Sequence, residues 1–175
     1  MDRGLDFLKS QVNNAVMQHG TFLRNLKDHE EQAEDPRFRN LCSRFIPPMQ
    51  QHQRLLEDYQ CELGTETGAA KELLGKALGA ARSIADSARE SDFLRLVGDI
   101  VEARQSEDTF KTFREAGKQL DNERLREIGD SGERHHDEFV KEANRLAQTM
   151  FVEHVRGVTA ADAIQASAQA RADIR

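Results

Sequence analysis

Residues 132–139 read Gly-Glu-Arg-His-His-Asp-Glu-Phe, and the fold of the chain can be worked out from this stretch. Glu133 and His136 stand three residues apart, a spacing that places both side chains on one face of a helix. Apolar residues continue that face from Leu125 to Met150 at steps of three and four residues. The stretch therefore predicts one long amphipathic helix whose inward face carries two residues of the kinds that bind metal ions.

The composition favours an all-α protein whose core is one domain of ordinary size. The chain has 175 residues, with three prolines and no tryptophan. Its formal net charge of -6 is spread over acidic and basic residues, without the basic block that would follow a nucleic-acid backbone. No segment approaches membrane-spanning length, and the acidic N-terminus lacks an apolar leader. We therefore expect a cytoplasmic protein that binds neither nucleic acid nor a membrane.

The two cysteines agree with a reducing compartment. Cys42 and Cys61 fall in one predicted helix, where the rise per residue would place them roughly 28 Å apart. That separation is far too large for a disulfide bond. We expect both thiols to be reduced.

Four long helices are predicted from the apolar stripes. They span residues 4–34, 36–63, 91–119 and 121–156. Asp35 and Ser91 stand where N-caps are expected, and Pro36 takes the first helical position after Asp35. Asp121-Asn122 marks the turn before the last helix. Pro47-Pro48 predicts a kink or a restart within the second helix.

Two further helices are expected beside these four. A shorter one, from Leu73 to Ala88, would cross from the second long helix to the third, and an Ala-rich helix would follow Gly157. We therefore divide the chain into a helical bundle domain, residues 1–157, and a helical tail, residues 158–175.

Polar residues of ligand type occupy four inward positions of the long helices. These positions are His19, His52, Glu107 and His136. His19 and His52 lie at nearly equal distances along the chain from the Asp35 turn, and Glu107 and His136 at nearly equal distances from the Asp121 turn. If each pair of helices folds back at its turn, all four side chains meet at one level of the bundle. Nitrogen and oxygen donors of this kind suit iron, zinc or manganese.

This arrangement resembles the ferritin-like superfamily, and its helix order is similar to the stress-associated ferritin-like proteins of poorly defined activity. The resemblance implies an antiparallel four-helix bundle with a crossover helix. It also implies a di-metal centre, with one Glu from each of two helices and a Glu-x-x-His motif from each of the other two. Glu133 and His136 match that motif in the last helix. Glu107, or alternatively Glu102, supplies the single carboxylate of the helix before it.

Two carboxylates of the family pattern are missing from this sequence. Met49 stands where the second helix needs a Glu before His52, and His19 stands where the first helix needs a Glu. The resemblance therefore implies a mononuclear or vestigial site rather than a bridged di-iron centre. Its centre would be formed by His19, His52, Glu107, Glu133 and His136. It would hold iron, manganese or zinc, or no metal.

Other interpretations of the same residues are open. Asp130 could begin a new helix with Glu133 as part of its capping box, and Glu133 would then be no ligand. His135 is expected to point sideways to solvent. A metal-free interaction or assembly protein, forming a homo-oligomer and most simply a dimer, is the alternative function. A hemerythrin-like oxygen carrier fits worst because it needs about five histidines. No catalytic triad or nucleotide-binding motif is present in the sequence, so no reaction is assigned.

Overall fold

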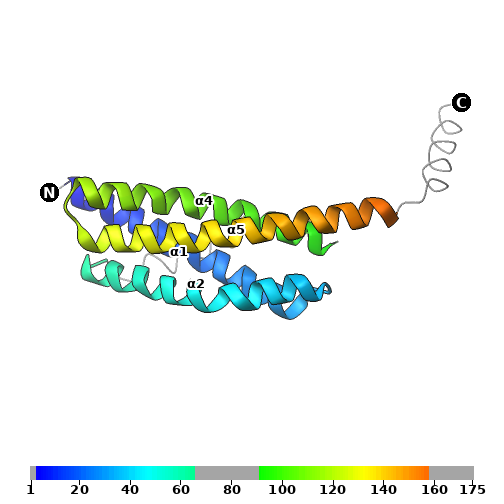
Figure 1. The fold of residues 1–175 in the computed structure, drawn as a ribbon. Helices are drawn as coiled ribbons and strands as arrows, with labels where there is room; N and C mark the ends of the chain where they lie inside the picture. Colours follow the sequence, from blue (N-terminus) through cyan, green and yellow to red (C-terminus); the bar gives the residue numbers. More distant parts are fainter. Residues whose placement is uncertain (1–2, 66–90, 158–175) are drawn as a thin grey trace, which may run out of the picture.

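The computed structural model describes residues 3–65 and 91–157, and the regular structure of these residues is entirely helical. The helices are α1 (Arg3–Gln32), α2 (Pro36–Glu62), α4 (Asp92–Gln119) and α5 (Glu123–Gly157) (Figure 1). The predicted all-α class and the four long helices are therefore confirmed. The predicted helix from Leu73 to Ala88 and the predicted tail after Gly157 lie outside the described residues.

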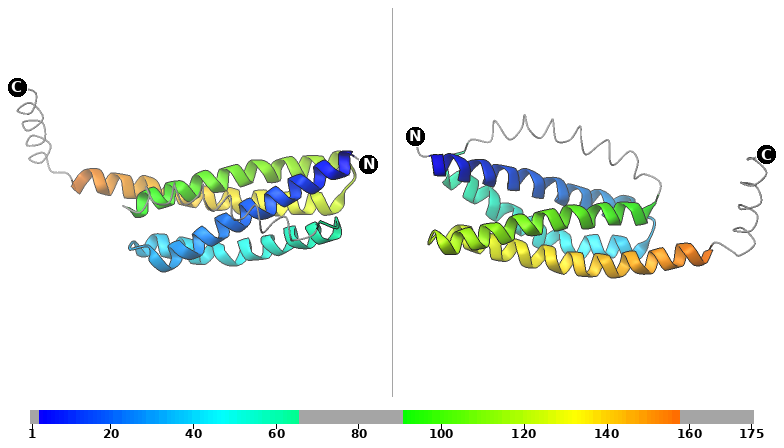
Figure 2. Two further views of the ribbon diagram at one scale, coloured as in Figure 1. Left: turned by 180° about the vertical axis from the view of Figure 1, so that it is seen from behind. Right: turned by 90° about the horizontal axis from the view of Figure 1, so that it is seen from above.

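The helices pack side by side into a bundle. Helix α1 lies against α2 and α4 lies against α5, and the two pairs meet along α1 and α4 and along α2 and α5 (Figure 2). The last turns of α5 extend past the end of the bundle (Figure 1). Within the described parts of the chain, none of the helices combines the length and the apolar character needed to cross a membrane. Cys42 is buried and Cys61 is exposed, and both are free thiols, as predicted.

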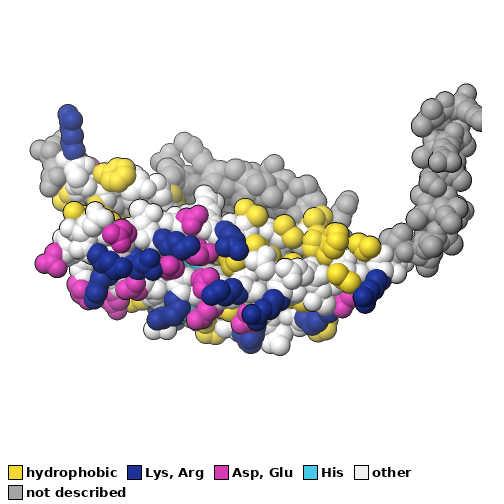
Figure 3. Space-filling view, turned by 45° about the horizontal axis from the view of Figure 1, so that its top comes forward, with side chains coloured by type: hydrophobic (Ala, Val, Ile, Leu, Met, Phe, Trp, Pro, Cys, Tyr) yellow, Lys and Arg dark blue, Asp and Glu magenta, His cyan; other side chains and the backbone are white. Residues whose placement is uncertain are grey.

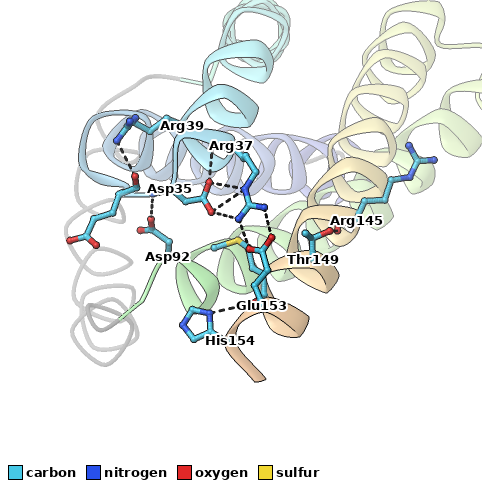
Figure 4. Close-up of polar contacts among 10 residues, drawn as sticks. Asp35, Arg37, Arg39, Asp92, Arg145, Thr149, Glu153 and His154 are labelled. Atoms are coloured by element: carbon cyan, nitrogen blue, oxygen red, sulfur yellow. Dashed lines mark hydrogen bonds and ion pairs between the residues drawn. The ribbon is translucent and has the colours of Figure 1, made fainter. Parts of the chain in front are cut away.

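Asp35 forms the turn between α1 and α2. Its carboxylate accepts a hydrogen bond from the backbone N–H of Arg37 at 2.8 Å, and Pro36 begins the helix, as the sequence predicts. The backbone N–H of Asp35 donates to Asp92 Oδ2 at 2.7 Å, and the Arg37 guanidinium bridges Asp35 and Glu153 (Figure 4). Hydrogen bonds from the Arg37 side chain hold the pKa of the Asp35 carboxyl below its usual value. This turn therefore links α2 to the start of α4 and the end of α5.

The other end of the bundle is closed by the turn between α4 and α5. Asp121 adopts a positive φ of 50°, and the side-chain oxygen of Asn122 accepts a hydrogen bond from the backbone N–H of Leu125 at 2.9 Å. The amide nitrogen of Asn122 donates to the Tyr59 hydroxyl on α2 at 2.9 Å. Asn122 thus caps α5 and joins its beginning to the end of α2.

A kink or a restart was predicted at Pro47 and Pro48; helix α2 continues through both prolines, so the restart is wrong. Each proline removes one backbone donor from the helix, which costs free energy. The apolar side chains around the prolines compensate, because Phe45, Ile46 and Met49 are all buried in the core. Tertiary packing therefore keeps the helix intact where its local sequence would break it.

Glycines bring α4 and α5 into close contact. A side-chain carbon added at Gly117 would overlap the backbone of Arg126, and one added at Gly129 would overlap the backbone of Arg114. Only a residue without a side chain fits at either position, as the phase of the apolar pattern suggested. The two helices are therefore in direct backbone contact over this length.

The apolar core has two parts. One lies toward the Asp35 turn and includes Phe22, Phe38, Phe45 and Phe139. The other lies toward the Asp121 turn and includes Val12, Leu56, Tyr59, Phe110 and Ile128. Three buried histidines, His19, His52 and His136, occupy the positions along α1, α2 and α5 at which one part gives way to the other.

Candidate functional site

Three of the predicted ligand positions meet in the core. His19, His52 and His136 come from α1, α2 and α5, and each is 0% exposed. The ring centroid of His19 lies 5.0 Å from that of His52 and 5.2 Å from that of His136, and the remaining pair is 6.2 Å apart. The counting of residues from the turns therefore placed these three side chains correctly at one level. We call these three residues the histidine cluster.

Two rings of the histidine cluster are held in a defined orientation. His19 Nδ1 donates a hydrogen bond to Gln53 Oε1 at 2.7 Å, and His136 Nδ1 donates to the Gly132 carbonyl oxygen at 2.7 Å. Because both acceptors are carbonyl oxygens, each neutral ring keeps its proton on Nδ1 and has a lone pair on Nε2. Neither Nε2 atom has a hydrogen-bond partner in the described chain. Hydrogen bonds from the other ring nitrogen to a carbonyl oxygen orient metal-binding histidines in many proteins.

The third ring, His52, is held by packing alone. Neither of its nitrogens has a hydrogen-bond partner among the described residues. Its ring meets the Phe110 ring edge to face, with centroids 4.5 Å apart, and a side-chain carbon built on Gly132 would lie 2.7 Å from its Nε2. Among the three rings, His52 is the one whose orientation no hydrogen bond fixes in the described chain.

Burial keeps the histidine cluster neutral. It lowers the pKa of His19 to about 4 and that of His136 to about 3, because an imidazolium ion would lose its hydration in this apolar core. The pKa of His52 falls well below its ordinary value for the same reason, and the neighbouring histidines lower it further. All three rings are neutral at physiological pH, which is the form that binds metal ions.

Glu107 lies in the core but is engaged with cations on its own helix. It is 4% exposed, and its carboxylate pairs with Lys111 Nζ at 2.5 Å and with Arg104 Nη1 at 3.7 Å. Its negative charge is balanced by these two neighbours.

Glu133 is likewise paired with a cation. Its carboxylate binds the guanidinium of Arg114 on α4. Helix α5 runs unbroken through this segment, so the alternative in which Asp130 begins a helix and Glu133 caps it is wrong. Gly129, the residue before Asp130, lies within the helix and allows its close contact with α4.

No ready-made metal site is present in the described residues. Across residues 3–65 and 91–157, no group of three His, Cys, Asp or Glu side chains is arranged to hold a metal ion. The histidine cluster brings three imidazole rings to one level of the bundle, but these rings are not among the groups arranged to hold an ion. A bound ion would require at least one ring to turn.

A second, partly buried polar group between α1 and α4 was not predicted. His29 Nδ1 donates to Asp99 Oδ2 at 2.8 Å, and Asn25 Nδ2 donates to both carboxylate oxygens of Glu102, at 3.0 and 2.9 Å. Burial raises the pKa of Asp99 and that of Glu102. Glu102 was considered only as an alternative ligand, and the signal that was missed is Asp99, an acidic residue on the inward face of α4.

His135 was also misjudged from the sequence. It was expected to point to solvent, but it is half-buried and its ring centroid lies 6.4 Å from that of His52. Its Nδ1 atom is buried and has no partner in the described chain. The adjacent pair of histidines in the opening stretch was the available signal, because a residue next to an inward-facing one can lie at the edge of the buried face.

The chain was compared with models of protein families, with curated proteins and with solved structures, and none gives a significant match. The function is therefore argued from the arrangement of these side chains alone.

Proposed function

We propose that this protein is a helical-bundle metal-binding protein whose core takes up one transition-metal ion through His19, His52 and His136. One observation carries the proposal. The Nε2 atoms of His19 and His136 and both ring nitrogens of His52 are buried without a partner in the described chain. Each buried group left without a hydrogen bond costs about 1–3 kcal/mol, and coordination to an ion would offset this cost.

The path of the chain supports the ferritin-like order that belongs to this proposal. The colour gradient in Figure 1 runs in opposite directions along α1 and α2, and again along α4 and α5. The connection between α2 and α4, residues 66–90, is long enough to include the crossover helix predicted from Leu73 to Ala88. An antiparallel bundle with one crossover helix would account for both features.

Rotation of His52 would complete the site. His19 and His136 already offer Nε2 lone pairs, and His52 is the ring that no hydrogen bond restrains. A metal ion binds imidazole nitrogen at about 2.0–2.1 Å, so the three rings would have to turn until their nitrogens converge on one position. The apolar rings of Phe22 and Phe110 would shield the ion from water.

The donor set favours zinc or iron over manganese. Imidazole nitrogen suits zinc and iron, whereas manganese prefers carboxylate, carbonyl and water oxygens. Glu107 and Glu133 are balanced by Lys111 and Arg114, and we assign them to the structure around the site rather than to the ion itself.

A titration of the metal-depleted full-length protein with Co²⁺, followed by visible absorption, tests this function. We expect one ion per chain, and loss of the absorption bands in His52→Gln and in His136→Gln. His154→Gln and Glu133→Gln are the matched controls, and both should bind as the native chain does. Binding of less than one ion per chain by the native protein, or unchanged binding by His52→Gln, would refute the proposal.

A second candidate function, assembly of two copies of this chain, is favoured by one exposed surface. Hydrophobic side chains gather toward the end of the bundle where α5 terminates (Figure 3). Phe151 and Val155 on α5 are 56% and 55% exposed, and Leu94 on α4 is 45% exposed. The Phe151 ring packs against that of Phe93. Clustered exposed apolar residues of this kind often mark an interface.

Sedimentation velocity distinguishes this candidate from a monomeric bundle. If two copies associate through this surface, the native chain sediments as a dimer and the double variant Phe151→Ser, Val155→Ser sediments as a monomer. The control is Val101→Ser, which changes an exposed apolar residue within α4. A monomeric native chain would exclude this candidate without affecting the metal proposal.

A further inference from the structure

A cavity lies between α1 and α4, apart from the histidine cluster. Its volume is about 350 Å³, which is within the range of pockets that hold small organic molecules. Four residues of α1 and two of α4 line it, namely Asn14, Met17, Gln18, Thr21, Glu102 and Gln105. No member of the histidine cluster is among them, so the cavity is a second place at which this chain could bind a ligand.

One carboxylate in the lining of this cavity is held in place without a strong cation beside it. Both oxygens of Glu102 accept hydrogen bonds from Asn25 Nδ2, at 3.0 and 2.9 Å, and that amide is neutral. Among the described residues, no Lys or Arg side chain acts on the Glu102 carboxyl. Glu107 and Glu133, by contrast, each pair with a Lys or an Arg side chain. The described chain therefore leaves the negative charge of Glu102 without such a partner.

Asp99 places a second negative charge beside Glu102. It lies three residues earlier on α4, a spacing that brings both side chains to one face of the helix. Asp99 is 1% exposed, and its Oδ1 atom has no hydrogen-bond partner in the described chain. Burial raises the pKa of both carboxyls, and the charge of Asp99 raises that of Glu102 further.

His29 compensates this pair of carboxylates only in part. Its Nδ1 atom donates to Asp99 Oδ2 at 2.8 Å, and it makes no hydrogen bond to Glu102. A positive charge in the cavity would stabilise both carboxylates, because each is partly or fully removed from water. The two acidic residues therefore favour a cationic ligand at the α4 side of the cavity.

The other walls of the cavity suit an organic cation. Glu102 is the one carboxylate in the lining, and the described chain has no group of three His, Cys, Asp or Glu side chains arranged for a metal ion. An alkylammonium group donates hydrogen bonds to carboxylate and amide oxygens, and its carbon chain packs on apolar surface. Met17 supplies such a surface, and the amides of Asn14 and Gln18 supply oxygen acceptors on α1.

We propose that the cavity between α1 and α4 binds a short aliphatic diamine or polyamine. One ammonium group lies on Glu102, the carbon chain lies against Met17, and a second ammonium group lies among the amide oxygens of α1. This site shares no residue with the histidine cluster, so the inference is independent of the metal-binding function proposed above.

Isothermal titration calorimetry of the full-length protein tests this inference. The ligands are 1,4-diaminobutane and spermidine, in about 0.15 M salt so that attraction by exposed charges is screened. We expect one ligand per chain, and a loss of affinity of about tenfold or more in Glu102→Gln, which keeps the size of the side chain and removes its charge. Glu115→Gln is the matched control, because it removes the same charge from an exposed position of α4 and should bind as the native chain does.

A second variant tests the cavity rather than the charge. Gln18→Trp keeps Glu102 and fills the cavity with an indole ring, so it should abolish binding. Circular dichroism and urea midpoints show that both variants fold.

Three results would overturn the inference. The first is a native chain that binds neither amine, and the second is an equal loss of affinity in Glu102→Gln and Glu115→Gln, which would indicate attraction by the net charge. The third is displacement of spermidine by an equal concentration of Mg²⁺, which would show a general cation site instead of one for an organic amine. Native affinity in Gln18→Trp would likewise place the ligand outside the cavity.

Discussion

Gly132 and His52 share one small space in the core. A side-chain carbon built on Gly132 would lie 2.7 Å from His52 Nε2 and would overlap the Phe110 ring. The carbonyl oxygen of Gly132 also accepts the hydrogen bond from His136 Nδ1 at 2.7 Å. One glycine therefore sets the positions of two of the three buried imidazole rings.

Replacement of this glycine should damage the site more than the fold. In Gly132→Ala the new methyl group displaces His52 and Phe110, so we expect Co²⁺ affinity to fall by about tenfold or more. The overpacked core should lose about 1–3 kcal/mol of unfolding free energy. Co²⁺ titration and urea unfolding measure the two effects. Native affinity in this variant would contradict the placement of His52 in the site.

Removal of the His52 imidazole should stabilise the metal-free protein. His52→Leu removes two buried nitrogens that have no partner in the described chain and fills their place with apolar atoms. We expect the unfolding free energy to rise by about 1–3 kcal/mol, measured by urea denaturation. His19→Leu is the comparison, and its gain should be smaller because it leaves Gln53 Oε1 without its donor. A destabilised His52→Leu would show that the His52 nitrogens are satisfied in the native protein.

Acid should destabilise the metal-free protein steeply. Folding lowers the pKa of His19, His52 and His136 below the ordinary value of 6.5, so the unfolded chain binds more protons as the pH falls. The stability that neutral rings contribute is complete above pH 6.5 and is lost as the pH drops toward about 4. Three such groups give a slope of up to about 4 kcal/mol per pH unit.

Urea midpoints measured between about pH 7.5 and about pH 5 follow this loss directly. The His52→Leu variant should show a slope smaller by about one third, because one of three titrating groups is absent. Equal midpoints at both ends of this range would be inconsistent with neutral, buried imidazoles.

The backbone contact between α4 and α5 should tolerate no side chain. In Gly129→Ala the added carbon overlaps the Arg114 backbone, so the helices must separate. We expect a loss of about 3 kcal/mol or more in unfolding free energy. Gly98→Ala is the matched control on an open face of α4, where nothing lies within 4 Å of the added carbon. It should gain about 1 kcal/mol from helix propensity. Equal effects of the two substitutions would rule out the close contact.

Local sequence signals predicted most of the fold. Asp35-Pro36, Ser91 and Asp121-Asn122 marked the turns correctly, because caps and turns depend on residues near one another in the chain. The apolar stripes placed His19, His52 and His136 on the inward faces, because the face of a helix is set by residues three and four positions apart in the chain. The predicted restart at Pro47-Pro48 failed, since distant packing partners decide whether a helix survives two prolines.

The details of the site depended on contacts that sequence spacing does not contain. Glu133 stands one turn from His136, but its carboxylate is turned to Arg114 on another helix. The inward position of Glu107 was predicted, but its pairing with Lys111 was not. Spacing along one helix predicts the height of a side chain in the bundle and the helix face that it occupies. The direction in which a long charged side chain points depends on which opposite charge lies within its reach.

The hydrogen bond between Tyr59 and Asn122 makes the fluorescence of Tyr59 a probe of how the helices of one chain pack together. The chain has one tyrosine and no tryptophan, so its intrinsic fluorescence comes from a single phenol ring. That ring is 4% exposed, and its hydroxyl accepts from the residue that caps α5. Separation of α2 from the turn between α4 and α5 would change the emission of this ring even if the helices themselves stayed intact. The order in which the two helix pairs dock can therefore be timed in the native sequence, without an added label.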